Sequence, residues 1–347
     1  MIKCKELVNS WPELFELFSG SLDVEFSDIA PIEEPRRDTI VFLPTHGDIK
    51  KALESLATGL VISKKRINEI PSTTGKTILA SKNVNLALAY ASHNYFARDP
   101  RKTVRERIHP SAVIAKTAKI AADSVIGANA VIGENVSIGR GTWIGANAVI
   151  EENSAIGENT RIHALVYIGW ETQIGNHCEV KPHTAIGGEG YGYAQDENGH
   201  HHHIPQRGRV VLEDHVTIGS HCAIDRSTFG ETRIGTGTKF DNHIHIAHNC
   251  RVGRHTLLTA GFKTAGSTSV GDHCVTGGNV SLKDHVKICD HVQLAGLTGV
   301  QHDITAPGAY GGHPIQPIKE YLKTLSLIKQ LPEIKKNIQR ILKHLGL

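Results

Sequence analysis

Aromatic residues are scarce in this chain: phenylalanine, tyrosine and tryptophan together make up 5% of its 347 residues. The core of a compact domain usually relies on such rings, so their scarcity favours an architecture of thin, regular layers. The six cysteines contain no Cys-x-x-Cys pair and are too sparse for a disulfide scaffold. We therefore expect reduced thiols.

Long apolar runs and a strong net charge are also missing. No segment approaches the roughly 18 uncharged apolar residues of a membrane span, and the N-terminal segment lacks the apolar run of a signal peptide. These absences predict a cytoplasmic protein with no membrane span. The formal net charge of +3 gives no general basis for binding nucleic acid, so we expect no nucleic-acid partner. Histidine, in contrast, is abundant, with 22 residues.

A six-residue period organises the middle of the chain. An aliphatic residue recurs thirteen times without a slip, at Ile114, Ile120, Ile126, Ile132, Ile138, Ile144, Ile150, Ile156, Ile162, Ile168, Ile174, Val180 and Ile186. Neither a helix nor an alternating strand explains this period. One bulky inward residue, one small inward residue and a glycine at the bend are typical of a short strand plus a turn. Three such units close one triangular coil.

The repeat is interrupted at residues 187–211, resumes at Leu212 and, after a four-residue offset before Ile234, continues to Val300. Its 28 units make a little over nine coils, roughly 45 Å tall at about 4.8 Å per coil. Insertions in a solenoid map to loops on one face, which is often the functional one. Four cysteines occupy the small inward position and are predicted to be packing residues rather than nucleophiles: Cys178, Cys222, Cys250 and Cys274.

The two flanking segments lack the repeat. Residues 1–105 predict a small α+β domain, with strands at 39–43, 60–63 and 77–80 and helices at 6–18, 49–57 and 84–95. Residues 307–347 predict a helical tail that begins at Ile318, with a kink or break at Pro332. The predicted fold is thus mainly β: a parallel β-helix over residues 106–306, with an inserted loop at 187–211, between an α+β domain and a tail.

The tail is strongly basic. It carries two glutamates, Glu320 and Glu333, against seven basic residues: Lys319, Lys323, Lys329, Lys335, Lys336, Arg340 and Lys343. This pattern is typical of a solvated amphipathic helix that packs on a neighbour, or of a landing surface for an acidic protein.

The densest polar cluster lies inside the repeat, between Phe240 and Asn249. His248 is suited to take a proton near neutral pH, and a carboxylate such as Asp241 would raise its basicity. Counting one coil onward from His248 reaches Gly266, whose backbone N–H could face developing negative charge. Two coils plus one residue lead to His285. This column predicts a strip for an extended ligand, and the alternative is a set of surface histidines on a hydrophilic edge.

Metal binding is a competing interpretation of the same cluster. His243, His245 and His248 could be zinc ligands, but a zinc site needs three ligands that converge at about 2.0–2.1 Å. Residues 243 and 245 share a face of an extended strand, whereas residue 248 falls beyond the next corner. We therefore predict no metal. The run from His200 to His203 lies in the interruption and predicts a hydrated loop.

The chain resembles a known family, the UDP-3-O-acylglucosamine N-acyltransferases of lipid A biosynthesis. The resemblance covers nearly the whole chain and rests on signatures in a fixed order: Asp28–Glu34, Asp38–Leu43, Gly188–Tyr193, Ile204–Val210, Ile224–Arg226, Asp241–Asn242, Ile246–Asn249 and Gly312–Pro317. Hexads alone are shared by many acyltransferases, whereas these signatures together are specific.

The resemblance implies a left-handed parallel β-helix and a homotrimer whose active sites lie between neighbouring prisms. It implies that an acyl group moves from the phosphopantetheine thioester of acyl carrier protein, a co-substrate, to the 2-amine of UDP-3-O-acyl-glucosamine, with no other cofactor. By carry-over, His248 is the general base, Asp241 orients it and the Gly266 N–H binds the oxyanion. Contacts to the nucleotide sugar are expected from His285 and Asn242, with His245 nearby. An acidic carrier protein would explain the basic tail.

The chain departs from the family in its N-terminal domain. The family holds uracil with Phe, Asn and Tyr spaced by three residues, and here Phe42 is followed by Thr45 and Asp48. We predict that Phe42 still contacts the nucleotide. Three alternatives to the N-acyltransferase remain: a sugar-nucleotide O-acyltransferase of the same fold, a zinc-dependent hydratase and a non-enzymatic β-solenoid scaffold.

Overall fold

The computed structural model describes residues 1–71, 74–96, 99, 101, 106–312 and 318–346. The chain divides into two compact units, residues 1–103 and residues 104–347. We describe each by itself.

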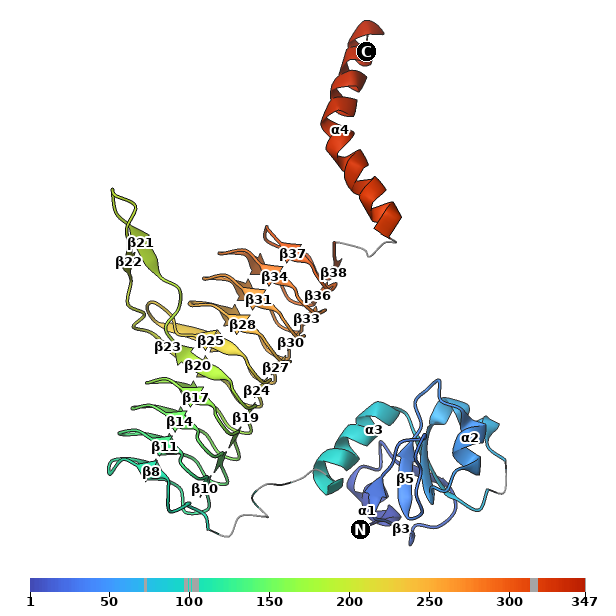
Figure 1. Cartoon of the computed structure of the whole chain (residues 1–347). Helices are drawn as coiled ribbons and strands as arrows, with labels where there is room; N and C mark the ends of the chain where they lie inside the picture. Colours follow the sequence, from blue (N-terminus) through green and yellow to red (C-terminus); the bar gives the residue numbers. More distant parts are fainter. Residues whose placement is uncertain (72–73, 97–98, 100, 102–105, 313–317, 347) are drawn as a thin grey trace. The chain divides into compact units, whose positions relative to one another are not determined.

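The first unit contains a five-stranded sheet (Figure 1). Along the sheet the order is β2 (Glu16–Ser19), β7 (Thr77–Ser81), β6 (Gly59–Ser63), β5 (Thr39–Phe42) and β4 (Asp28–Ile29). β2 is antiparallel to β7, and the other neighbours are parallel. The unit also has α1 (Cys4–Ser10), α2 (Ile49–Glu54), the 3₁₀ helix Lys64–Glu69, α3 (Val84–Ala91), the π-helix Ser92–Phe96, and a pair of strands, β1 (Ile2–Lys3) and β3 (Glu25–Phe26).

The three predicted strands and two of the three predicted helices of this unit are present. The expected helix over residues 6–18 is wrong, because α1 ends at Ser10 and β2 follows at Glu16. Trp11 precedes Pro12, and a residue before proline is disfavoured in the helical conformation. Trp11 accordingly has φ −142° and ψ 69°.

The second unit contains a three-sided parallel β-helix, which confirms the fold expected from the repeat (Figure 1). In the described part of the chain its faces have ten, ten and nine strands. Face 1 contains β10 (Val125–Ile126), β13 (Trp143–Ile144), β16 (Arg161–Ile162), β19 (Glu179–Val180), β24 (Thr217–Ile218), β27 (Lys239–Phe240), β30 (Leu257–Leu258), β33 (Val275–Thr276), β36 (Val292–Leu294) and β38 (Gly308–Tyr310).

Face 2 contains β8 (Val113–Ile114), β11 (Val131–Ile132), β14 (Val149–Ile150), β17 (Tyr167–Ile168), β20 (Ala185–Gly188), β25 (Ala223–Asp225), β28 (His245–Ile246), β31 (Lys263–Thr264), β34 (Ser281–Leu282) and β37 (Gly299–Val300). Face 3 contains β9 (Lys119–Ile120), β12 (Ser137–Ile138), β15 (Ala155–Ile156), β18 (Gln173–Ile174), β23 (Arg209–Leu212), β26 (Glu231–Ile234), β29 (Arg251–Val252), β32 (Ser269–Val270) and β35 (Lys287–Ile288). The chain visits the faces in the order 1, 2, 3.

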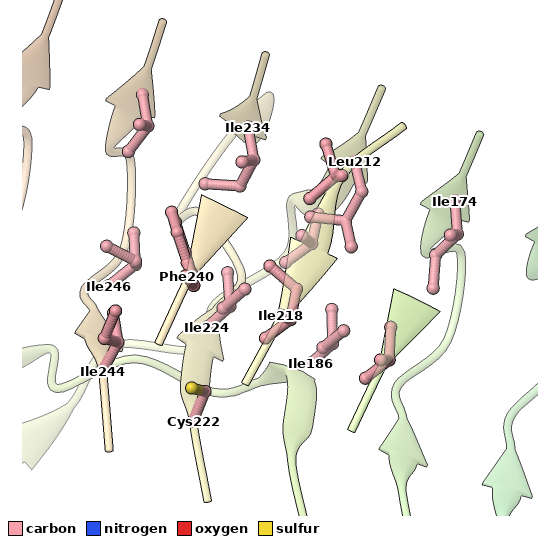
Figure 2. Packing of buried hydrophobic residues seen from close by; sticks show 14 of the residues in the cluster. Ile174, Ile186, Leu212, Ile218, Cys222, Ile224, Ile234, Phe240, Ile244 and Ile246 are labelled. Atoms are coloured by element: carbon pink, nitrogen blue, oxygen red, sulfur yellow. The ribbon is translucent and has the colours of Figure 1, made fainter. Parts of the chain in front are cut away.

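The inward aliphatic residues form the core of the β-helix. Figure 2 shows Ile186, Ile224 and Ile246 from three coils of face 2, and each is at most 1% exposed. The register pairs residues of one coil with those 18 positions away, as in Ile132 and Ile150. The four inward cysteines are buried and free. Burial raises the pKa of the Cys178 thiol to about 11, which keeps it protonated.

The backbone conformation at the corners of the coil explains why histidine is abundant. Nine histidines adopt positive φ at corners of the coil: His177, His183, His215, His221, His243, His255, His273, His285 and His291. Asparagine and histidine are among the non-glycine residues that tolerate this conformation best. Several of these imidazoles stack on one another with ring centroids 4.8–5.3 Å apart. Most of them are therefore turn residues rather than ligands.

The interruption forms a hairpin that projects from the prism (Figure 1). Its strands are β21 (Tyr193–Gln195) and β22 (His201–His203), paired antiparallel. His201 to His203 are exposed, as predicted for a hydrated loop, although they lie in a strand. His202 Nε2 lies 2.9 Å from Asp196 Oδ2, and this hydrogen bond lowers the pKa of Asp196.

The tail is one helix, α4 (Ile318–His344), which continues through Pro332, so of the predicted kink or break the break is absent. The signature residues 313–317 lie outside the described residues. Among the described residues, no helix has the length and apolar character that crossing a membrane requires.

Candidate active site

The predicted column of His248, Gly266 and His285 is present on one edge of the prism. All three follow strands of face 2, so they lie on the edge between faces 2 and 3. The Ser267 N–H donates to the carbonyl of His248 at 2.9 Å, and the His285 N–H donates to the carbonyl of Gly266 at 3.1 Å. Successive coils are therefore bonded through these corners. His248 is half-buried and His285 is exposed.

The His248 ring is oriented by Asn249. His248 Nδ1 lies 3.0 Å from Asn249 Oδ1, which also accepts the backbone N–H of Thr228 at 3.1 Å. A backbone N–H can only donate, so this atom of Asn249 is the oxygen and can only accept. His248 Nδ1 must then carry the proton, and the lone pair of the neutral imidazole is on Nε2. No described residue hydrogen-bonds to this nitrogen, so it is available as a base.

Two glycines flank the His248 ring. A Cβ on Gly266 would lie 2.6 Å from Cε1 and 2.7 Å from Nε2 of His248, and a Cβ on Gly190 would lie 2.8 Å from His248 Cβ. Any side chain at either position would therefore push the ring aside. Within the described residues the Gly266 N–H has no acceptor, so it is free for an oxyanion. Gly190 comes from the interruption and was missed by the sequence analysis.

The predicted bond between Asp241 and His248 is not present in the single chain, and the orienting role falls to Asn249. Asp241 follows β27 and lies on the edge between faces 1 and 2, one corner away from His248. Its carboxylate accepts the N–H groups of Asn242 at 2.8 Å and Ala260 at 3.2 Å. Asn242 lies on the same edge, where its Oδ1 accepts the Ser220 N–H at 2.8 Å. The seven steps from Asp241 to His248 take the chain from one edge of the prism to the next. The spacing of the two residues in the sequence did not show this.

The histidines considered as zinc ligands lie in different surroundings. His243 stacks on His221 with a centroid distance of 5.2 Å, His245 faces Asp225 at 3.8 Å, and His248 faces Asn249. Among the described residues, no three histidine, cysteine or acidic side chains are grouped closely enough to hold a metal ion. The three histidines therefore do not form the convergent set that zinc requires.

Phe42 is a core residue rather than an open stacking platform. It is 8% exposed and packs edge-on against Phe15, with ring centroids 6.3 Å apart. Asp48 caps α2 by accepting the Lys51 N–H at 3.1 Å, which accounts for an acid at this position. The carbonyl of Thr45 accepts a hydrogen bond from Arg66 at 2.9 Å. The structure thus gives these residues structural roles and leaves little of Phe42 exposed for contact with a base.

We expect Phe42→Leu to leave the KM for a nucleotide sugar within about twofold of its original value, because the ring contributes little exposed surface. Phe42→Ala should instead lower the stability of the first unit by about 3–5 kcal/mol, since it leaves a cavity. Steady-state kinetics and thermal melting check the two expectations. A large rise in KM for Phe42→Leu at unchanged melting temperature would restore the stacking role.

Arg226 joins both interruptions of the repeat. It lies in the four-residue offset, is 1% exposed, and donates to the carbonyls of Gly187, Gly208 and Trp170 at 2.8, 3.1 and 2.9 Å. The guanidinium also lies 3.6 Å from the centroid of the Trp170 ring. Gly187 and Gly208 lie near the two ends of the interruption. Arg226 therefore fixes the segment that places Gly190 against His248.

Asn249 offers a direct test of the His248 geometry. We expect Asn249→Leu to lower kcat about tenfold, because losing one hydrogen bond of about 0.5–1.5 kcal/mol frees the ring to adopt the other tautomer. Asn249→Asp should retain activity, since it keeps an acceptor. Its negative charge raises the pKa of His248, so the acidic limb of the kcat/KM profile should move to higher pH. Identical pH profiles for Asn249→Asp and the unmodified protein would contradict this role.

Comparison with known proteins agrees with the family resemblance found in the sequence. A family model described as the GMPPB C-terminal domain matches residues 108–191, a part of the repeat. The UDP-3-O-acylglucosamine N-acyltransferase of Methylococcus capsulatus is 38% identical over 319 residues, which cover 92% of this chain and 90% of that protein. The protein of the same name from Pseudomonas syringae is 35% identical over 93% of this chain and 90% of its own length.

Solved structures with hexapeptide repeats are also similar. The UDP-N-acetylglucosamine O-acyltransferase LpxA of Moraxella catarrhalis is 27% identical, and the match covers 66% of this chain and 82% of that one with a TM-score of 0.48. The two relatives above, in contrast, match more than nine tenths of this chain at more than 30% identity. The chain therefore belongs to the UDP-3-O-acylglucosamine N-acyltransferase family of acyltransferases.

Proposed function

We propose that this chain transfers an acyl group from acyl carrier protein to the 2-amine of UDP-3-O-acyl-glucosamine, a step of lipid A biosynthesis. The amine nitrogen attacks the thioester carbon, a C–N bond forms, and the C–S bond breaks. His248 Nε2 takes the proton that the attacking nitrogen loses and returns it to the leaving sulfur. The Gly266 N–H donates to the oxyanion of the tetrahedral intermediate.

One observation carries this proposal. Asn249 Oδ1 accepts from His248 Nδ1, so the basic lone pair is on Nε2, beside the unpaired N–H of Gly266. A base and an oxyanion donor on neighbouring coils are the two groups that acyl transfer to an amine requires. The phosphopantetheine thioester is the co-substrate in this scheme, and no metal takes part in it.

We further propose a homotrimer in which Asp241 and Asn242 of one prism approach the His248 edge of the next. In a single chain the two sets of residues lie on different edges, as a site shared between chains requires. The α4 helix supports this assembly. Its exposed Leu331, Ile334, Ile338 and Ile341 repeat with spacings of three and four residues, which is the pattern of a coiled-coil seam.

The basic side chains of α4 are the proposed landing surface for the acidic carrier protein. Lys323, Lys329, Lys335, Lys336, Arg340 and Lys343 belong to this helix. Charge complementarity of this kind mainly accelerates encounter. We place the reaction in the cytoplasm. The six cysteines, all free, suit a reducing compartment.

Purified protein incubated with a panel of acyl carrier protein thioesters and UDP-sugars tests the proposal. Mass spectrometry should find an amide on UDP-3-O-acyl-glucosamine. An ester on UDP-N-acetylglucosamine would instead identify a sugar-nucleotide O-acyltransferase. Stoichiometric zinc in elemental analysis, together with hydration of a substrate, would indicate a zinc-dependent hydratase. If no pair of substrates were turned over, the result would favour a non-enzymatic β-solenoid scaffold.

A further inference from the structure

Asp225 is a nearly buried carboxylate beside the His248 site. It ends β25, which pairs with β28 so that Ile224 lies opposite Ile246. Asp225 therefore lies one coil from Ala247, the residue before His248. Its side chain is 15% exposed, and His245 Nε2 lies 3.8 Å from its Oδ2. No group in the described part of the chain donates a hydrogen bond to this carboxylate.

Other carboxylates of the β-helix, in contrast to Asp225, have hydrogen-bond donors. Glu231, with a side chain 18% exposed, is bound by Arg233 at 2.7 Å. Asp272, 26% exposed, accepts the Arg254 N–H at 2.7 Å and pairs with its guanidinium at 2.9 Å. Asp241, although exposed, accepts two backbone N–H groups. A buried acid is costly without donors, so the fold supplies them elsewhere and leaves Asp225 without any.

We propose that Asp225 is the specificity-determining residue for the acceptor, and that its carboxylate holds the primary amine which attacks the thioester. This inference rests on the proposed function. One N–H of the amine donates to Asp225 while the other donates to His248 Nε2. The bound amine thus supplies the donor that the fold omits, and His245 forms the outer wall of the subsite.

The electrostatics of the subsite suit an amine. Burial raises the pKa of Asp225, and the fields of His245 and His248 counteract this effect. The groups that face the carboxylate are thus two imidazoles, with the thiol of Cys250 affected by its charge. Among the residues that the structure describes, no lysine or arginine pairs with it, and the side chain of the adjacent Arg226 donates to three carbonyls instead.

The number of hydrogens explains the selectivity. An amine has two N–H groups and can donate to Asp225 and His248 together. A hydroxyl has one hydrogen, so one of the two acceptors would be left unpaired. A site built to hydrogen-bond a particular group rejects an analogue that lacks it strongly, because its own polar groups then remain unsatisfied.

Direct binding tests the inference on the full-length protein. The dissociation constants of UDP-3-O-acyl-glucosamine and of its analogue with a 2-hydroxyl are measured by calorimetry for the unmodified chain, Asp225→Asn and Asp225→Leu. We expect the unmodified chain to favour the amine by about tenfold or more, as for a hydrogen bond to a charged group. Asp225→Leu should abolish this preference and Asp225→Asn should reduce it, while binding of the hydroxyl analogue stays unchanged.

Controls separate this role from a structural one. Asp272→Asn, at a paired carboxylate, should keep the preference. Asp225→Asn should melt at or above the temperature of the unmodified chain, because it removes an unsatisfied buried charge. An unchanged preference in both Asp225 variants would overturn the inference even if the protein acylates the amine. If the protein did not acylate the amine but still preferred to bind it, and lost this preference in the Asp225 variants, only the proposed function would be overturned.

Discussion

Replacing His248 with alanine is expected to lower kcat by about 10²–10⁴-fold, the usual contribution of a general base. The KM for the nucleotide sugar should change far less than kcat, because the ring gives the bound amine one hydrogen bond, whereas it carries the whole proton transfer of the reaction. The ring lies between Gly190 and Gly266, neither of which has a side chain that could take its place. Steady-state kinetics with a saturating acyl donor measure the effect.

A matched control for this variant is available on the same prism. His273→Ala removes an imidazole that stacks at another edge with His255 and His291, and it should leave kcat unchanged. Thermal melting of both variants checks that the coil is intact. Full activity of His248→Ala would assign the base to another residue and remove the basis of the proposed mechanism.

Arg226→Met is expected to lower the free energy of unfolding by about 3–9 kcal/mol, since the carbonyls of Gly187, Gly208 and Trp170 lose their donor at about 1–3 kcal/mol each. Methionine keeps much of the volume and removes every hydrogen bond. The ends of the interruption would then separate from the coil, Gly190 would leave His248, and activity should fall together with stability. Melting and limited proteolysis at the hairpin between β21 and β22 measure the change.

The control for Arg226 is an arginine with the opposite environment. The Arg254 side chain is 65% exposed and pairs with Asp272. Arg254→Met should change stability by no more than about 1 kcal/mol, as for other exposed ion pairs. If Arg226→Met were as mild as Arg254→Met and left the hairpin resistant to protease, Arg226 would not fix the interruption.

Periodicity predicted the β-helix well because its signal is purely local. One inward aliphatic every six residues determines strand, bend and register, and Ile132 pairs with Ile150 as counting by eighteen requires. The column of His248, Gly266 and His285 followed from the same counting. The stacked corner histidines also occupy a fixed hexad position, three residues after the inward residue, as His177 after Ile174, although no prediction was made from that position.

The surroundings of His248 depend on the two interruptions of the repeat, where the six-residue period no longer predicts which residues meet. Thr228 reaches Asn249, and Arg226 reaches Gly187 and Gly208, only because the four-residue offset and the interruption meet in space. An arginine directly after Ile224 and Asp225, at the start of a break in register, was the available signal. Asp241 was assigned to His248 by the family resemblance, and in the single chain a corner of the coil separates the two residues.

The position of the column near the C-terminal end of the stack affects its durability. On face 2, β28 is followed by β31, β34 and β37, so His285 lies beneath the last strand of that face. Each coil touches only its neighbours, and such arrays fray from their ends. β38 covers β36 on face 1 and closes this end. The final coil thus delays the fraying that would reach the coil of His285 first and the coil of His248 two coils later.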